Sequence, residues 1–188
     1  MEHKARITTK KIVFAALMAA LVTVSSALRI TLPLDIGGNT SFHLGNIFCA
    51  LSGILLGPWL GGAAAGLGSA IYDMMNPAYI AECWLTFLMK GAYGVAAGLV
   101  IRCGKKEWGY FRSTLATIAG AAVYALLYLA KSYVKPILVN GITAEAAMLT
   151  VIGKIPATIF NAVVAIICAP ILAVAIRKAL QKNHLTLA

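Results

Sequence analysis

The feature that most restricts how this chain can fold is a series of long segments that carry almost no charge. One of them is interrupted once, by Lys90, and the five segments are 12–28, 43–72, 83–101, 113–130 and 155–176. A helix of about 20 apolar residues crosses the hydrocarbon core of a bilayer. Hydrophobic residues make up 61% of the chain and charged residues 12%, which is too apolar for a soluble domain. We therefore expect an all-α membrane protein.

The second segment is too long for one span and contains Gly57-Pro58 near its middle. Proline ends or kinks a helix, so this segment is predicted to form two short helices joined by a tight turn. The prediction is one domain, 1–188, with six transmembrane helices at 11–30, 42–56, 59–75, 81–101, 113–135 and 154–178.

Basic residues are distributed unevenly around these spans. An even number of spans puts both termini and the loop after the fourth helix on one side, and basic loops face the cytoplasm. We therefore expect cytoplasmic termini and a multi-pass protein of a prokaryotic plasma membrane, in contact with lipid and not with nucleic acid. Eleven of the 16 basic residues lie in these regions, namely Lys4, Arg6, Lys10, Lys11, Arg102, Lys105, Lys106, Arg112, Arg177, Lys178 and Lys182.

The chain lacks the sequence motifs of several familiar catalytic and nucleotide-binding sites. It contains no Walker A pattern, no H-E-x-x-H and no G-x-S-x-G. Its four cysteines form no C-x-x-C pair, and three of them lie in apolar runs. The missing motifs indicate that the chain is neither a self-sufficient pump nor an intramembrane protease, and the cysteines predict no disulfide and no metal site. We expect no enzyme activity and no cofactor in this chain.

Small residues at a spacing of four let helix backbones approach closely. Such pairs occur at Ala15 and Ala19 and at Ala16 and Ala20 in the first predicted helix. Similar glycine pairs occur in later helices. These residues either pack the bundle internally or receive the helices of a partner.

Ionisable and amide side chains gather at the outer ends of the predicted helices. An ionisable group inside a membrane is costly and usually serves a function. One interpretation is that they converge on a ligand. The other is that Lys131 and Lys135 extend to lipid headgroups while Lys90 pairs with Glu82 or Asp73. Lys154 begins the sixth span, and Asn161 lies seven residues later on the same helical face.

The first outer loop, 31–43, is long for a small bundle, and long loops often act as lids. The topology places several aromatic residues near it. They form either the wall of a small-molecule pocket or a belt at the membrane interface. These residues are Phe42, Tyr79, Trp84, Tyr128 and Phe160.

Three runs carry a resemblance to a known family: HLGNIFCALSGILLGP at 43–58, GGAAAGLGSAIYD at 61–73 and TFLMKGAYGVAAG at 86–98. They resemble the substrate-binding S components of energy-coupling factor (ECF) vitamin transporters, and most closely the riboflavin-type subgroup. The resemblance extends over nearly the whole chain. It implies the six-helix S-component bundle.

The resemblance further implies a binding protein that captures a vitamin from outside and docks on an EcfT-like transmembrane coupling protein with two ATPase subunits, which use ATP and Mg. The alanines that would face the coupling protein are Ala15, Ala16, Ala19 and Ala20. The residues that would bind the substrate are Asn39, His43, Asn46, Asp73, Tyr79, Glu82, Trp84, Lys90, Tyr128, Lys131, Lys154 and Asn161.

The identity of the solute stays open between a riboflavin-like compound, cobalamin and other ring-bearing cofactor precursors. Two other functions also stay open. One is a stand-alone secondary transporter of a cofactor precursor, and the other is an intramembrane enzyme that uses Lys90 or His43.

Overall fold

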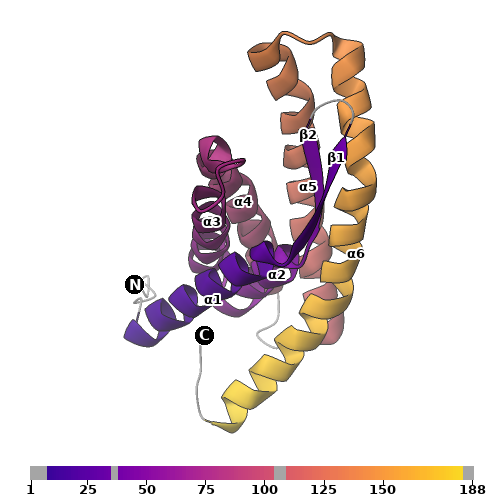
Figure 1. Cartoon of the computed structure of the whole chain (residues 1–188). Helices are drawn as coiled ribbons and strands as arrows, with labels where there is room; N and C mark the ends of the chain where they lie inside the picture. Colours follow the sequence, from indigo (N-terminus) through magenta and orange to yellow (C-terminus); the bar gives the residue numbers. More distant parts are fainter. Residues whose placement is uncertain (1–7, 35–37, 104–108, 184–188) are drawn as a thin grey trace, which may run out of the picture.

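The computed structural model describes residues 8–34, 38–103 and 109–183, with the backbone alone at 33, 34, 38 and 39. In this part of the chain six α-helices enclose one core, and a two-stranded hairpin lies at one end (Figure 1). The elements are α1 (Thr9–Ala27), β1 (Arg29–Leu34), β2 (Gly38–His43), α2 (Gly45–Leu56), α3 (Pro58–Met74), the single 3-10 turn η1 (Ile80–Glu82), α4 (Cys83–Arg102), α5 (Tyr110–Asn140) and α6 (Ala144–Lys182). The six-helix prediction is confirmed.

The predicted break at Gly57-Pro58 separates α2 from α3. Gly57 has φ of +82°, a conformation that other residues rarely adopt. A Cβ atom there would also lie 2.1 Å from the Arg102 guanidinium. Pro58 begins α3, where its missing N–H costs nothing because the first amides of a helix have no partner within it.

The short helix α2 depends on its neighbours. α2 has 12 residues and rises only about 18 Å, too short to cross the hydrocarbon core alone. It contacts each of the other five helices, and ten of its residues are buried. Four helical segments of the described chain are long and apolar enough to span a membrane: Thr9–Ala27, Ile80–Arg102, Tyr110–Asn140 and Ala144–Lys182.

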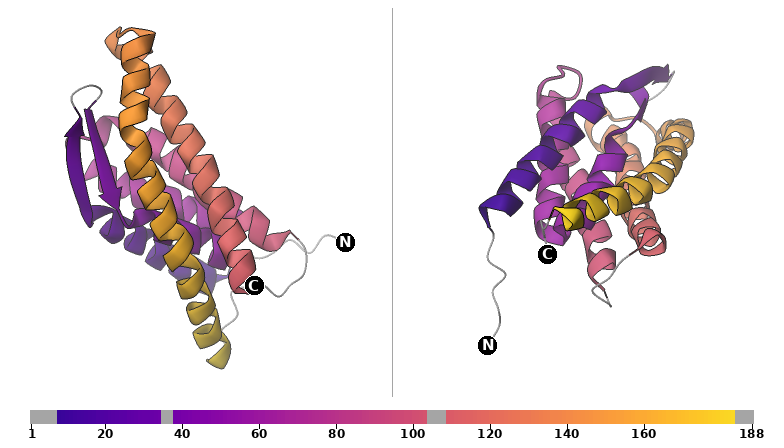
Figure 2. Two further views of the ribbon diagram at one scale, coloured as in Figure 1. Left: turned by 90° about the vertical axis from the view of Figure 1, so that its right-hand side faces the viewer. Right: turned by 90° about the horizontal axis from the view of Figure 1, so that it is seen from below.

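α5 and α6 are longer than expected from hydropathy, with 31 and 39 residues. α5 continues past its predicted end at 135, and α6 begins before its predicted start at 154. Both rise above the other helices, as Figures 1 and 2 show. Lysine is a good helix former, so a charge that limits an apolar segment does not end the helix. Gly141, in the left-handed conformation, ends α5, and the Thr143 side chain accepts a hydrogen bond from the Ala146 N–H at the start of α6.

The expected loop at 31–43 is an antiparallel hairpin. Its register runs from Arg29 opposite His43 to Leu34 opposite Gly38. Successive side chains of each strand point to opposite faces of the hairpin. The ring of Phe42, on β2, packs edge-on against Phe160 of α6, with ring centroids 5.0 Å apart. The hairpin therefore lies alongside α6 (Figure 2).

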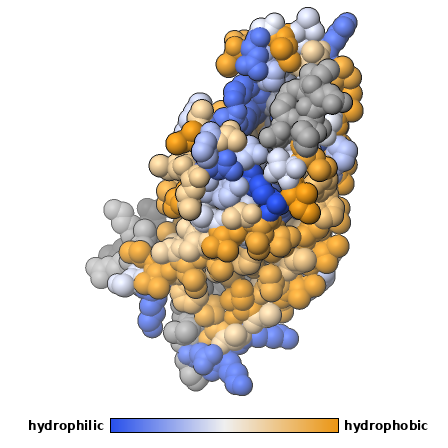
Figure 3. All heavy atoms as spheres, in the orientation of Figure 1, coloured by the Kyte–Doolittle hydropathy of each residue, from blue (hydrophilic) through white to orange (hydrophobic). Residues whose placement is uncertain are grey.

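The opposite end of the molecule holds the start of α1 and the end of α6 (Figure 1). There Arg102 donates a hydrogen bond to the Leu56 carbonyl at 3.1 Å, and Arg112 donates one to the Cys103 carbonyl. Figure 3 shows hydrophobic residues across the middle and lower part of one face, with hydrophilic residues at the bottom and in the upper part. The start of α1 and the end of α6 lie at the same end, as an even number of crossings requires. That this end faces the cytoplasm stays a prediction.

Candidate functional site

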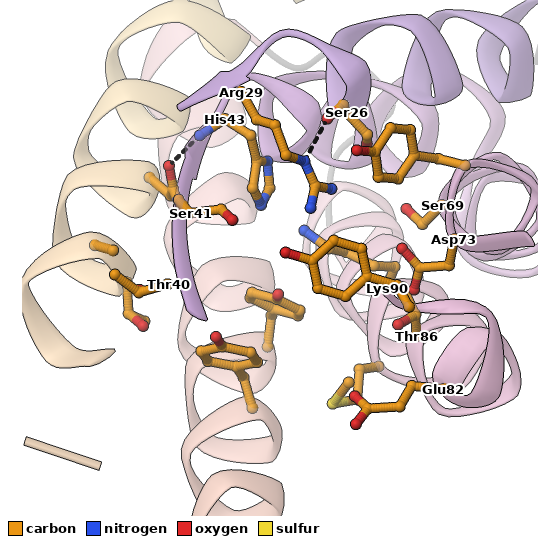
Figure 4. A pocket seen from close by; sticks show the side chains of 18 of the residues that line it. Ser26, Arg29, Thr40, Ser41, His43, Ser69, Asp73, Glu82, Thr86 and Lys90 are labelled. Carbon is orange, nitrogen blue, oxygen red and sulfur yellow. Dashed lines mark hydrogen bonds between the residues drawn. The ribbon is translucent and has the colours of Figure 1, made fainter. Parts of the chain in front are cut away.

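A cavity of about 310 Å³ lies beneath the hairpin. Its walls come from the end of α1, both strands, η1, α3, α4, α5 and α6, so segments from most of the chain meet there (Figure 4). Its size is at the lower end of the range for small-molecule sites. The cavity is thus large enough for a compact ring-bearing solute.

Nine of the twelve side chains predicted to bind substrate line this cavity. Three do not. Asn46 lies beside it and contacts Lys90, Trp84 is 60% exposed, and the side chain of Asn39 is outside the described part of the structure. The nine are His43, Asp73, Tyr79, Glu82, Lys90, Tyr128, Lys131, Lys154 and Asn161.

Arg29 is the main lining residue absent from the sequence prediction. Its guanidinium lies over the ring of Tyr72 at 4.1 Å and near that of Tyr79 at 5.0 Å, and its Nε donates to the Ser26 carbonyl at 2.9 Å. Its position in the sequence could have identified it. Arg29 is a basic residue at the outer end of the first span, whereas the positive-inside rule places basic residues at the cytoplasmic ends of the spans. Other unpredicted lining residues are Ser26, Thr40, Ser41, Ser69, Tyr72, Ala78, Thr86, Met89, Tyr124, Ala157 and Thr158.

Lys90 is buried, with 4% of its surface exposed. Its ammonium donates a hydrogen bond to the Asn46 side chain and lies 4.0 Å from the centroid of the Tyr124 ring. Among the described residues no carboxylate lies within 4 Å of it. The interpretation in which Lys90 pairs with Glu82 or Asp73 therefore does not hold.

Glu82 instead pairs with two lysines of α5. One of its oxygens accepts from Lys131 and the other from Lys135. All three side chains are only partly exposed. The two lysines therefore tie η1 to α5, contrary to the interpretation that they extend to lipid headgroups.

Tyrosine rings form one wall of the cavity. Tyr124 and Tyr128, one helical turn apart on α5, are stacked with centroids 5.7 Å apart and an interplanar angle of 16°. The ammonium of Lys154 lies 5.7 Å from the Tyr128 ring and donates to the Ser132 hydroxyl at 3.4 Å. This wall offers flat apolar surface next to positive charge.

Asn161 connects α6 to the hairpin. Its oxygen accepts from the backbone N–H of His43 at 2.9 Å, and its amide donates to the Ser41 carbonyl at 2.8 Å. The Nδ1 atom of His43 accepts from the Gly45 N–H at 3.2 Å, which requires that nitrogen to be unprotonated. Burial, followed by the charges of Lys90 and Arg29, holds the pKa of His43 well below its ordinary value.

The four alanines of α1 divide into two sets. Ala15 and Ala19 pack against the core, and a Cβ on Gly68 of α3 would lie 2.3 Å from the Ala19 carbonyl oxygen. Ala16 and Ala20 are exposed. Exposed apolar residues continue their surface along the helix, namely Ile12, Val13, Leu17 and Val24.

No metal-binding cluster of three or more His, Cys, Asp or Glu side chains occurs in the described ranges. The four cysteines are free thiols, and Cys49 is buried.

Three matches with known proteins bear on the identity of this chain. The family model described as "ECF-type riboflavin transporter, S component" matches residues 6–178. A protein of Pyrococcus woesei, described as an uncharacterized protein in the gap 3′ region, is 35% identical over 114 residues, which cover 60% of this chain and 72% of that protein. The crystal structure of an S-component for biotin from an ECF-type ABC transporter superimposes with a TM-score of 0.62, covering 92% of this chain and 95% of that chain. Its sequence identity is 14%, so this likeness shows the fold alone.

Proposed function

Because this chain belongs to the family of S components of ECF-type riboflavin transporters, we propose that it captures a vitamin-like solute in the cavity beneath the β1–β2 hairpin and passes it to an ATP-driven coupling module. The family consists of vitamin-binding transport subunits. The chain is therefore a membrane transport subunit and not an enzyme.

The observation that carries the proposal is the composition of the cavity. Tyr124 and Tyr128 offer stacked ring surface, while Arg29, Lys90 and Lys154 bring polar groups from three different helical or strand segments. Such a combination of flat apolar walls and a few convergent polar groups is the usual make-up of a site for a small organic ligand. The hairpin covers this cavity and is held by Asn161.

The proposed membrane is the prokaryotic plasma membrane, with the basic end of the bundle in the cytoplasm. Described basic residues at that end include Lys10, Arg102, Arg112 and Lys178. Positive charge is retained on the cytoplasmic side of membrane proteins. The cavity would then open toward the outside, where a scarce nutrient is captured.

The proposed docking surface is the exposed face of α1 around Ala16 and Ala20. Small side chains there allow a helix of an EcfT-like coupling protein to approach closely. Two ATPase subunits bound to that protein would use ATP and Mg. Ala15 and Ala19 serve the internal contact with α3 instead.

A binding and complex-formation experiment tests this function. The purified chain should bind a solute stoichiometrically by calorimetry, without converting it, and should form a stable complex with the coupling protein and its ATPases. Native mass spectrometry of protein purified from rich medium identifies any solute that copurifies. A chain that binds no subunit of the module would contradict the proposal and favour a stand-alone transporter.

A further inference from the structure

The charges around the cavity are unbalanced. Among the described residues five basic side chains lie outside the basic end of the bundle, and all five gather here: four line the cavity and Lys135 pairs with a lining carboxylate. Among the described residues only two carboxylates line it, Asp73 and Glu82. Since Glu82 already holds Lys131 and Lys135, three cations share the single remaining carboxylate.

These three cations are Arg29, Lys90 and Lys154, and each is held by neutral groups. Arg29 has the Ser26 carbonyl and two tyrosine rings, Lys90 has the Asn46 amide oxygen and a ring, and Lys154 has the Ser132 hydroxyl and a ring. No carboxylate lies within 4 Å of any of them among the described residues. Carbonyls, hydroxyls and ring faces attract a cation but do not neutralise it.

Arg29 is arranged to receive a ligand. Its Nε is occupied by the Ser26 carbonyl, while no described residue accepts a hydrogen bond from its two terminal nitrogens. Figure 4 shows the guanidinium of Arg29 and the ammonium of Lys90 pointing into the same space. A guanidinium presents parallel N–H donors that match the two oxygens of a carboxylate or phosphate.

A partly buried cation without a counter-charge raises the free energy of the folded chain. A ligand that supplies the counter-charge binds more strongly there, because electrostatic attraction is stronger where water is excluded. Asp73 compensates one charge at most. Of these three charges two therefore remain for a ligand to meet, one at Arg29 and Lys90 and the other across the cavity at Lys154. The Glu82 group adds one more, because a single carboxylate there meets two lysines.

We propose that the solute of this chain is an anion, in which a carboxylate or phosphate group lies against Arg29 and Lys90 while a flat ring lies along Tyr124 and Tyr128. This assignment rests on the proposed function and adds the chemical class of the substrate. Lys154 contributes a third positive charge from the α6 wall. A neutral ring-bearing solute would leave Arg29, Lys90 and Lys154 without a counter-charge from the ligand.

Inorganic phosphate is the first probe. Thermal unfolding of the purified chain is followed while phosphate replaces chloride at constant ionic strength, for the natural sequence, Arg29→Gln, Lys154→Gln and Lys178→Gln. Lys178 is exposed near the inner end of α6, so its variant controls for the loss of one charge.

We expect a saturable rise in melting temperature that Lys178→Gln retains. Arg29→Gln should weaken the apparent phosphate affinity about tenfold or more, because a hydrogen bond to a charged group is lost. If Arg29→Gln does not fold, Lys154→Gln and Arg29→Lys replace it, with a smaller loss expected in each. Absence of saturation, or equal affinity in the cavity variants and the Lys178→Gln control, would overturn the proposal.

A pair of ring-bearing probes separates this inference from the function on which it rests. Riboflavin and riboflavin 5′-phosphate share one ring system and differ in charge. Binding of the phosphate at least tenfold tighter supports the inference. Equal or tighter binding of riboflavin overturns it and leaves the transport function standing; if neither binds, the inorganic phosphate titration decides.

Lipid is the other source of a phosphate group. The titration is therefore repeated in nanodiscs with and without phosphatidylglycerol. A phosphate-dependent shift that persists in both supports a soluble anion. Loss of the shift when phosphatidylglycerol is present would assign the site to a lipid headgroup and overturn the proposal.

Discussion

Asn161 in α6 accepts a hydrogen bond from the backbone N–H of His43 at 2.9 Å, although 118 positions separate the two residues. Together with the bond from its amide to the Ser41 carbonyl, this contact fixes the hairpin over the cavity. A side chain that offers both a donor and an acceptor in this way takes the place of a neighbouring strand at the exposed edge of β2.

Asn161→Ala should loosen the hairpin and weaken solute binding. Loss of two largely buried hydrogen bonds costs about 1 to 3 kcal/mol, or roughly 5- to 150-fold in affinity if the hairpin must be in place for binding. Hydrogen exchange at residues 40–43 and calorimetry measure the two effects. Asn161→Asp, which keeps the acceptor, should lose less; unchanged exchange and affinity in Asn161→Ala would show that the hairpin is held by other contacts.

Lys154→Ala should weaken binding of the solute by about 1 to 3 kcal/mol while the chain still folds, because the ammonium lies beside the cavity and the Ser132 hydroxyl is its only hydrogen-bond partner among the described residues. Calorimetry in detergent measures this loss, and the melting temperature checks the fold. Glu145→Ala, an exposed change at the start of the same helix, provides the control. Affinity equal to that of the natural sequence in Lys154→Ala would place the solute away from this wall.

The hydropathy pattern was enough to predict six helices and the break at Gly57-Pro58. Apolar segments in a membrane must satisfy their backbone within a helix, so length and charge identify them. The hairpin was not predicted because Gly38–His43 is short and only weakly alternating, and because its contact with α6 is made by Asn161, far along the chain. Pattern analysis has no means of detecting such a contact.

The site was predicted in part for a related reason. Polar residues at outer helix ends converge in a small bundle, which is why nine candidates line the cavity. Their partners could not be predicted, since Glu82 meets Lys131 and Lys135 only through the packing of η1 against α5. Arg29 was missed because its position at the outer end of the first span was the only signal that set it apart from the other basic residues.

Stability should fall as the pH drops below about 6.5, and His43 should contribute to this. In the unfolded chain the imidazole takes up a proton near its ordinary pKa, whereas in the folded chain its pKa is lowered by burial, so the contribution is complete above that pH and is lost below it. A single group of this kind changes the free energy of unfolding by at most about 1.4 kcal/mol per pH unit.

His43→Asn isolates this contribution. Asparagine can still accept from the Gly45 N–H two residues later, but it does not titrate. Melting temperatures between pH 5 and pH 7 should therefore fall less steeply in the variant than in the natural sequence. Parallel curves would mean that other groups account for the whole pH dependence.

Ala16→Trp should prevent assembly with the coupling protein while solute binding by the isolated chain stays nearly unchanged, because Ala16 is exposed on α1 and a large ring there keeps a partner helix away. Affinity capture of the module measures assembly. Ala19→Trp serves as the contrasting variant: Ala19 lies against Gly68, so it should lower stability and expression. Equal loss of solute binding in both variants would make Ala16 an internal packing residue.

The most direct test of the central claim is solute uptake into proteoliposomes, measured for this chain alone and together with the coupling protein, the two ATPases and ATP. The solute is the one that copurifies with the chain. We predict binding but no accumulation with the chain alone, and ATP-dependent accumulation with the complete module. Accumulation of the solute by the chain alone, without ATP or partner subunits, would contradict the account and make it a stand-alone transporter.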